Sequence, residues 1–242
     1  MIFNLFKSKP TLNELIPKGF VDIHSHVLPG IDDGAKNVEE SIKLINNMKE
    51  MGFSKIIGTP HTYTGLYDNT NTTIKNSYNS IINHLDNNII IEYASEYFLD
   101  DSIIEKAEKK TLLCVKDNYV LVETNFVSKP IGLYEIIFEL TVNGYVPVLA
   151  HPERYLFLHN NYKENYKLKD SGCEFQINLF STTGLYGNII AKFSDKLIND
   201  NLIDYAGTDI HRNQHLKKFN DLVIIKNTLK LENVIKNNLK FM

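Results

Sequence analysis

Two histidines separated by one residue stand near the start of the chain, just before a segment rich in Gly and Asp. In a strand, side chains two positions apart share a face, so Asp22, His24 and His26 are expected on one side. Neutral imidazole is a common ligand of transition metals, and segment 30–34 adds carboxylate oxygens. The pattern is typical either of a metal site or of two hydrogen-bonded histidines in a half-buried strand.

More histidines and carboxylates follow short apolar runs that are typical of buried parallel strands. Taken singly, polar residues at strand ends are common. Here, however, they are predicted at the carboxyl end of six of seven strands, where the catalytic residues of a β/α barrel gather. The sequence therefore predicts one polar cluster, and three other histidines, His84, His159 and His215, are expected at the surface. The predicted cluster consists of His24, His26, His61, Glu96, Glu123, His151, Asp209 and His211.

Helical segments alternate with these strands. A helix over 38–51 is predicted to begin after Asn37 and to end at Gly52, and others are predicted over 133–143 and 189–199. Parallel strands require crossover connections, so this alternation indicates a parallel sheet. The first strand lacks the Gly-rich phosphate loop of a dinucleotide fold, which favours a closed or partly closed β/α barrel over an open sheet.

Composition limits the classes of protein that fit. The chain has 242 residues, 43% of them hydrophobic and 23% charged, which suits one α/β domain over 19–242 preceded by an N-terminal arm over 1–18. A formal net charge of −3 gives no electrostatic case for binding nucleic acid. No signal peptide and no apolar run of about 18 residues is present, so no transmembrane segment is expected and a cytoplasmic location is predicted.

The two cysteines exclude another type of site. Cys114 and Cys173 are too few for a disulfide framework and too distant for a Cys-x-x-Cys motif, which favours a reducing compartment. A cysteine-based tyrosine phosphatase needs an Arg six residues after its nucleophile. Val120 and Leu179 occupy those positions, so neither cysteine is expected to be catalytic.

Three segments, 24–35, 151–155 and 207–211, carry a resemblance that covers the chain from about Phe20 onward. They resemble the bacterial protein-tyrosine phosphatases of the polymerase and histidinol phosphatase (PHP) superfamily, which accompany the tyrosine kinases that control capsule and exopolysaccharide export. The resemblance implies a single α/β domain with a distorted seven-stranded β/α barrel and a cluster of three metal ions. The expected metal is manganese, with iron or zinc as alternatives, and the expected partner is a phosphotyrosyl protein, a bacterial tyrosine kinase.

The resemblance also implies roles for individual residues. Arg154 would bind the substrate phosphate and, with Asp209 and His211, would form the catalytic set. Glu92 remains an alternative to Glu96 as a ligand, and Asp32 an alternative to Asp33. The implied ligands are His24, His26, Glu96 and Asp209 for one metal, Glu96, Glu123 and His151 for a second, and Asp33, His61 and His211 for a third.

The expected chemistry is hydrolysis of a phosphomonoester by metal-activated hydroxide, because divalent ions can generate the nucleophile and neutralise the phosphoryl group. A small-molecule phosphoesterase, such as a histidinol-phosphate phosphatase, would use the same metals and is the main alternative. The acidic balance argues against a nucleic-acid exonuclease. The alternative outside enzymes is a metal-stabilised scaffold protein, whose ions should be fully enclosed by protein ligands.

Overall fold

Parallel strands and helices alternate through the computed structural model, which describes residues 9–86 and 88–242. The strands are β1 (Phe20–Ser25), β2 (Phe53–Gly58), β3 (His61–Thr62), β4 (Ile90–Tyr93), β5 (Glu96–Phe98), β6 (Tyr119–Glu123), β7 (Val146–Ala150), β8 (Glu174–Asn178) and β9 (Tyr205–Gly207). The α-helices are α1 (Leu12–Leu15), α2 (Val38–Glu50), α3 (Asn71–Ile82), α4 (Asp101–Glu108), α5 (Leu133–Val142), α6 (Leu156–Asn160), α7 (Lys163–Asp170), α8 (Asn188–Asn199), α9 (Asn213–Leu216) and α10 (Thr228–Asn237). Short 3₁₀ turns are η1 (Pro152–Arg154), η2 (Leu179–Thr183), η3 (Lys217–Asn220) and η4 (Asn238–Phe241).

Hydrogen bonding divides these strands into two parallel sheets, with the orders β1-β2-β4 and β3-β5-β6-β7-β8-β9. The predicted α/β fold with parallel strands is confirmed, but the distorted barrel of seven strands is not, and the described residues form no closed barrel. The strand expected over 55–61 is interrupted at Pro60, which has no N–H to donate to a ladder, and its two halves belong to different sheets. The strand expected from Ile89 to Glu96 is also interrupted, between Tyr93 and Glu96, and β4 and β5 belong to different sheets.

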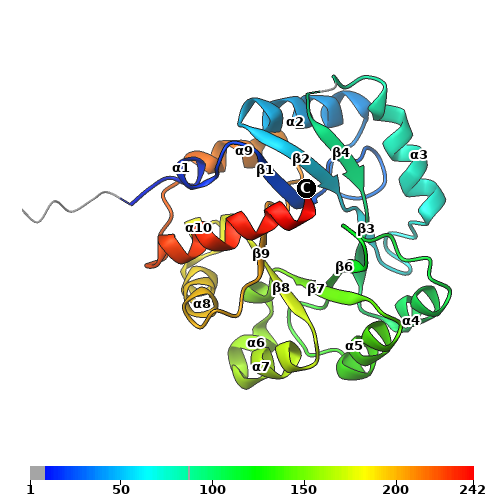
Figure 1. Cartoon of the computed structure of the whole chain (residues 1–242), viewed down its shortest axis with the longest axis vertical. Helices are drawn as coiled ribbons and strands as arrows, with labels where there is room; N and C mark the ends of the chain where they lie inside the picture. Colours follow the sequence, from blue (N-terminus) through cyan, green and yellow to red (C-terminus); the bar gives the residue numbers. More distant parts are fainter. Residues whose placement is uncertain (1–8, 87) are drawn as a thin grey trace, which may run out of the picture.

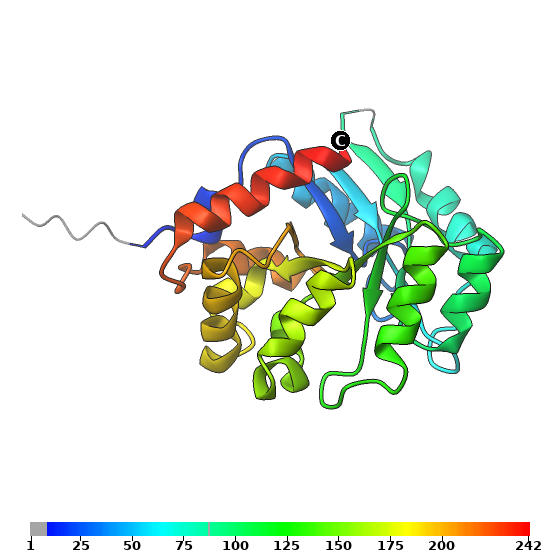
Figure 2. The ribbon, with the colours of Figure 1, turned by 60° about the horizontal axis from the view of Figure 1, so that its bottom comes forward.

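The two sheets adjoin where β1 lies beside the end of β9. The N–H of Asp209 donates to the carbonyl of His24 at 2.8 Å, and the N–H of His26 donates to the carbonyl of Ile210 at 2.9 Å. The buried Asp22 carboxylate accepts a 2.5 Å bond from the Thr208 hydroxyl. The strands consequently surround a common centre, with the helices on the outside (Figure 1; Figure 2 gives a second view).

The predicted helices are present, with ends close to those expected. The side chain of Asn37 accepts the N–H of Glu40 at 2.9 Å and caps α2, which stops just before Gly52. Gly52 and Gly144 adopt φ values of 97° and 82° after α2 and α5, in the left-handed region that favours glycine.

Apolar packing occupies both faces of the strands. The larger cluster joins strand residues such as Val120 and Leu149 to helix residues such as Ile45 and Ile137. Most members of a smaller cluster take the alternate positions of the same strands, so they lie on the face away from the outer helices, and Ala94, Val115 and Phe241 join them from outside the strands. Its members are Val21, Ile23, Ile57, Ala94, Val115, Leu121, Val148, Ala150, Tyr205 and Phe241.

Of the predicted N-terminal arm, residues 1–8 lie outside the described part of the chain. The remainder packs on the domain, because Leu12 is buried and its N–H donates to the carbonyl of Asp221 at 3.1 Å. Within residues 9–86 and 88–242, none of the helices has the length and apolar character needed to cross a membrane.

Candidate metal centre

Nine side chains from distant parts of the sequence converge on one another. Most stand at or after the carboxyl end of a strand, but His61 and Glu96, predicted at such ends, are the first residues of β3 and β5. They form four overlapping groups, and within each group the candidate ligand atoms lie within 4.8 Å of one another. The groups are His26, Asp33, His61 and His211; His24, His151 and Asp209; His24, His26 and Glu96; and His61, Glu96 and Glu123. All nine residues that the sequence singled out as ligands are included, although the groups differ from the three sets implied by the resemblance.

Hydrogen bonds at the far side of the rings orient the first two histidines. Nδ1 of His24 lies 2.8 Å from Oε1 of Gln176, whose own amide nitrogen donates to a carbonyl. Nδ1 of His26 lies 2.7 Å from Oδ2 of Asp32. Because both partners accept hydrogen bonds, each Nδ1 carries the proton in the neutral ring and each Nε2 presents a lone pair. Such outer hydrogen bonds are typical of metal-ligating histidines.

The lone pairs of these histidines face other electron-rich atoms. The two Nε2 atoms are 3.3 Å apart, and both lie 3.2–3.4 Å from Oε2 of Glu96 and from Oδ1 of Asp209. Oε2 of Glu96 is buried and has no hydrogen-bond partner within the described residues. A cation between these atoms would satisfy all of them, and mixed nitrogen and oxygen donors suit divalent transition metals. The residues present therefore fit a metal cluster.

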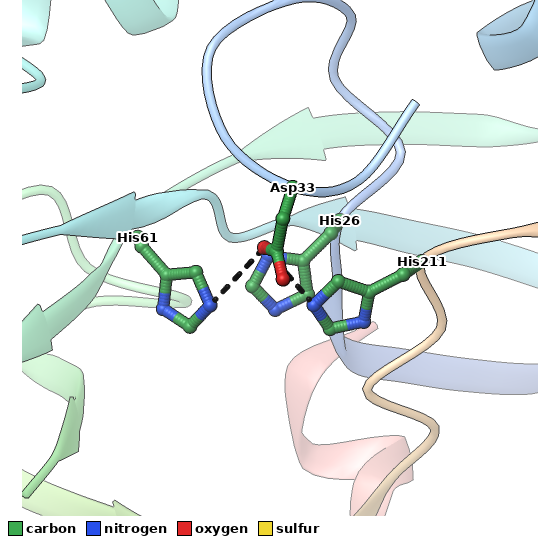
Figure 3. Close-up of side chains that lie close together, drawn as sticks. All are labelled: His26, Asp33, His61 and His211. Atoms are coloured by element: carbon green, nitrogen blue, oxygen red, sulfur yellow. Dashed lines mark ion pairs between the residues drawn. The ribbon is translucent and has the colours of Figure 1, made fainter. Parts of the chain in front are cut away.

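The two alternatives left open by the sequence occupy different positions. Asp32 orients His26, whereas Oδ1 of Asp33 lies 3.4 Å from Nε2 of His211 and 3.6 Å from Nε2 of His61. Figure 3 shows Asp33 between the imidazoles of His61 and His211, with His26 beside it. His211 is oriented like the others, since its Nδ1 lies 2.8 Å from the carbonyl oxygen of Asp209.

Glu92 and Glu96 are likewise separated. Glu92 is half exposed and pairs with Lys55 at 2.9 Å, away from the histidines. Glu96 is fully buried, with Oε1 at 3.1 Å from Nε2 of His151 and Oε2 at 3.1 Å from Nδ1 of His61. Glu96 is thus the glutamate that faces the cluster.

Two of the nine residues have a strained backbone. His151 and Asp209 adopt positive φ values of 37° and 52°, in the left-handed region where non-glycine residues are uncommon. The N–H of His151 donates to the carbonyl of Gln176 at 2.7 Å, and that of Asp209 is held by β1. Such strain, about 1–3 kcal/mol per residue, persists where the surrounding structure enforces it and is frequent at functional sites.

Charges within the cluster also shift the pKa values of its own side chains. Burial raises the pKa of the Glu96 carboxyl, but the charges of His24 and His61 outweigh this and hold it well below its ordinary value. Burial lowers the pKa of His61, yet the carboxylates of Glu96 and Glu123 raise it to about 10. The carboxylates thus favour protonated imidazoles, whereas a metal ion requires neutral ones, so metal binding would release protons.

Arg154 is placed beside this cluster. Nη1 of Arg154 lies 2.9 Å from Oδ2 of Asp209, and its guanidinium stacks between Phe126 and Tyr186, 4.6 and 4.5 Å from the ring centres. Both aromatic rings line the same cavity of about 450 Å³ as Arg154. The cavity also reaches His61, Glu123, His151, Asp209 and His211.

Sequence analysis did not predict several residues that belong to the site or support it. His215, expected at the surface, lines the cavity and its Nδ1 accepts the N–H of His211 at 3.3 Å. His159 also differs from the expectation, since it stacks on Phe193 at 3.8 Å. Gln176 and Asn178 are buried polar residues of β8, and Asn178 donates to Oδ2 of Asp209 at 3.0 Å. Their alternation with apolar residues along one strand was a signal that could have revealed them.

Comparison with known proteins identifies relatives of this chain. The family described as "Capsular polysaccharide synthesis, CpsB/CapC" matches residues 20–223. The putative tyrosine-protein phosphatase CapC of Staphylococcus aureus is 33% identical over 230 residues, which cover 90% of this chain and 89% of that protein. Tyrosine-protein phosphatase YwqE of Bacillus subtilis is 31% identical over 206 residues, which cover 82% of this chain and 81% of YwqE.

Two solved structures are similar to the fold of this chain. One similar structure has a TM-score of 0.76 and 29% identity, and the match covers 82% of this chain and 84% of that one. It comes from work that describes YwqE of Bacillus subtilis and CpsB of Streptococcus pneumoniae as metal-dependent tyrosine phosphatases. A histidinol phosphate phosphatase from Lactococcus lactis shares the fold, with a TM-score of 0.56 and 14% identity, covering 91% of this chain and 94% of that one. The resemblance seen in the sequence is confirmed, and the chain belongs to the CpsB/CapC family.

Proposed function

We propose that this chain is a metal-dependent tyrosine-protein phosphatase of capsule and exopolysaccharide synthesis, acting on a bacterial tyrosine kinase in the cytoplasm. The observation that carries the proposal is the cluster of nine ligand-type side chains, six of which line one cavity together with the partly buried Arg154. Residues 19–242 form the catalytic domain in this proposal. The ions would be held by His24, His26, Asp33, His61, Glu96, Glu123, His151, Asp209 and His211.

Manganese is the metal we propose, with iron and zinc as competitors for the same donors. Such ions would supply a nucleophile from water near neutral pH and neutralise the charge of the phosphoryl group. The protein's own contribution begins with Gln176 and Asp32, whose hydrogen bonds keep both imidazoles turned toward the centre. Arg154 offers a planar fork that can bind two phosphate oxygens, and the rings of Phe126 and Tyr186 restrict its position.

Aromatic side chains next to the cluster support a phosphotyrosyl substrate. A second pocket of about 280 Å³ shares His61, Asp33, Glu123 and Phe126 with the first. The Tyr67 ring stacks on His61 at 5.4 Å. Flat apolar walls of this kind suit the ring of a phenyl phosphate, which gains from offset stacking. The pocket is lined in addition by Tyr63, Leu66, Tyr67, Phe98, Thr124 and Asn125.

Metal removal tests the proposed function directly. Chelation until the protein is verified to be metal-free should reduce hydrolysis of a phosphotyrosyl peptide to background, and manganese should restore it. Metal content by mass spectrometry and the melting temperature, with and without manganese, report binding independently of turnover. Full activity in the metal-free protein would contradict the proposal.

Two comparisons sharpen that experiment. The variant His24→Ala should lose both turnover and the manganese-induced rise in melting temperature, whereas His84→Ala, at an exposed position outside the cluster, should retain both. Activity should be higher on the phosphotyrosyl peptide than on histidinol phosphate. The reverse preference would indicate a small-molecule phosphoesterase that uses the same residues.

A further inference from the structure

A third hollow, a groove of about 630 Å³, opens beside the metal centre between the start of α2 and the segment that leads into α9. Its two walls are tied together, because the side-chain amide of Asn47 donates to Oδ1 of Asn213 at 2.7 Å. We call it the α2–α9 groove, and it is lined by Asp32, Asp33, Gly34, Ala35, Lys36, Glu40, Lys43, Leu44, His211, Arg212, Asn213 and Gln214.

The groove is continuous with the cavity over the cluster. Asp33, His211 and Arg212 line both hollows. Figure 3 shows Asp33 and His211 facing each other, so these two residues mark the boundary between the hollows. A chain whose phosphorylated side chain enters the cavity can therefore continue along the α2–α9 groove.

Three cationic side chains of the groove form no ion pair with the described residues. Lys36, Lys43 and Arg212 are exposed, and within residues 9–86 and 88–242 none of them pairs with a carboxylate. Three unpaired cations along one groove attract anionic groups, in a protein whose net charge is negative.

Two of the three acidic residues of the same groove face histidines, and the third, Glu40, is the one carboxylate of the groove without an ion pair among the described residues. Asp32 bonds the ring of His26, and Asp33 faces His211. Oε2 of Glu40 accepts the backbone N–H of Lys36 at 3.2 Å. The α2–α9 groove therefore offers more unpaired positive than negative charge to a ligand.

We propose that the α2–α9 groove binds an acidic segment of the protein substrate, next to the phosphorylated residue. The inference rests on the proposed phosphatase function and adds a preference for glutamate or aspartate near the phosphotyrosine. Exposed ion pairs contribute little individually and are screened by salt, so the groove acts mainly on KM and at low ionic strength. It does not affect the chemistry of a substrate too small to reach it.

The test compares two phosphotyrosyl peptides of equal length, one with Glu and Asp flanking the phosphotyrosine and the other with Gln and Asn. At low salt the wild-type protein should prefer the acidic peptide by about three- to tenfold in kcat/KM, as expected for two or three exposed ion pairs. The preference should disappear in the double variant Lys36→Gln/Lys43→Gln and in high salt. Turnover of p-nitrophenyl phosphate should stay unchanged in that variant.

A matched control separates local from overall charge. Lys75 and Lys192 are exposed lysines on α3 and α8 that do not line the groove, so Lys75→Gln/Lys192→Gln makes the same change in net charge and should keep the preference. Equal kcat/KM for the two peptides in the wild-type protein, or a preference that survives Lys36→Gln/Lys43→Gln, would overturn the proposal.

Direct binding distinguishes failure of the groove from failure of the phosphatase function. Fluorescence anisotropy of a labelled acidic peptide measures affinity without turnover, and Lys36→Gln/Lys43→Gln should weaken it while the control variant should not. A protein that hydrolyses none of the substrates but binds the acidic peptide through Lys36 and Lys43 would contradict the phosphatase function and support the groove. A phosphatase whose peptide affinity is the same in both double variants would retain its function and refute the groove.

Discussion

The two ends of the strands differ in what their side chains do. At the amino end, the ring of Phe241 packs edge-on against Tyr119 and Tyr205, with ring centres 5.6 and 4.7 Å away. The buried Lys55 there donates to the carbonyl of Phe241 at 2.8 Å and pairs with Glu92. At the carboxyl end, histidines and carboxylates converge, two backbones are strained, and the buried Oε2 of Glu96 has no hydrogen-bond partner within the described residues.

This difference indicates that the amino end of the strands serves stability and the carboxyl end serves binding and chemistry. The amino end gains free energy of folding from apolar contact and satisfied polar groups. The carboxyl end concentrates strain and unpaired lone pairs, which lower stability and are retained for binding and chemistry. Substitutions at the two ends should therefore have separable effects on stability and on activity.

The largest effect on stability is expected at the amino end. Phe241 is fully buried, so Phe241→Ala should lower the free energy of unfolding by about 3–5 kcal/mol through lost contact and the cavity left behind. Urea unfolding at fixed metal content measures this loss. The kcat of the folded fraction should remain close to wild type.

The matched control is Phe138→Ala on α5. Phe138 is 62% exposed, and this substitution should change the free energy of unfolding much less. A Phe241→Ala protein that is as stable as wild type, or folded but inactive, would show that the two ends do not have separate effects on stability and activity.

The next effect concerns catalysis at the carboxyl end. Arg154→Ala should raise the barrier by about 2–4 kcal/mol, or roughly 30- to 1000-fold in kcat/KM on a phosphotyrosyl peptide, because a positioned charge over the phosphate is lost. Arg154→Lys should recover only part of this, since an ammonium keeps the charge but not the fork.

Metal content decides how that result is interpreted. Arg154 contacts Asp209, a candidate ligand, so both variants must bind as much metal as wild type before their kinetics are compared. If an Arg154→Ala protein with full metal content had wild-type kcat/KM, Arg154 would only form an ion pair with Asp209 and would not bind the substrate phosphate.

The smallest effect is expected for the cysteines, which belong to neither end. Burial raises the pKa of Cys114 to about 11 and that of Cys173 to about 12, so both thiols stay protonated near neutral pH and are poor nucleophiles. The double variant Cys114→Ser/Cys173→Ser should keep near-wild-type turnover, and iodoacetate should leave the wild-type activity intact. Rapid inactivation of the fully metallated enzyme by iodoacetate would disagree with the proposed mechanism.

Much of the fold could be predicted because local signals agree with it. Asn37 and Gly52 mark the two ends of α2, and β-branched runs mark the strands. The division into two sheets could not be predicted, because hydrogen bonding between strands depends on residues distant in sequence. Pro60 was a visible signal for a break, because proline has no N–H to donate to a ladder.

The candidate site was predicted for the residues that follow apolar runs and less well for those that support them. Glu123 ends β6 and His61 follows the apolar run of β2, so their position in sequence was informative. The role of Asp32, which orients His26, depends on where a loop folds back, and no spacing encodes it. His215 lines the cavity from α9, whose position depends on contacts with the distant helix α2.

The cluster draws residues from His24 to His211, so an ion held there connects segments separated by most of the sequence. In the unfolded chain, joining such distant residues costs closure entropy, so binding favours the folded state by mass action. Bound metal should then protect the chain from proteases, which cut mainly the opened forms. Metal shortage in a cell would therefore reduce the lifetime of this protein as well as its catalysis, and metal supply would set its abundance.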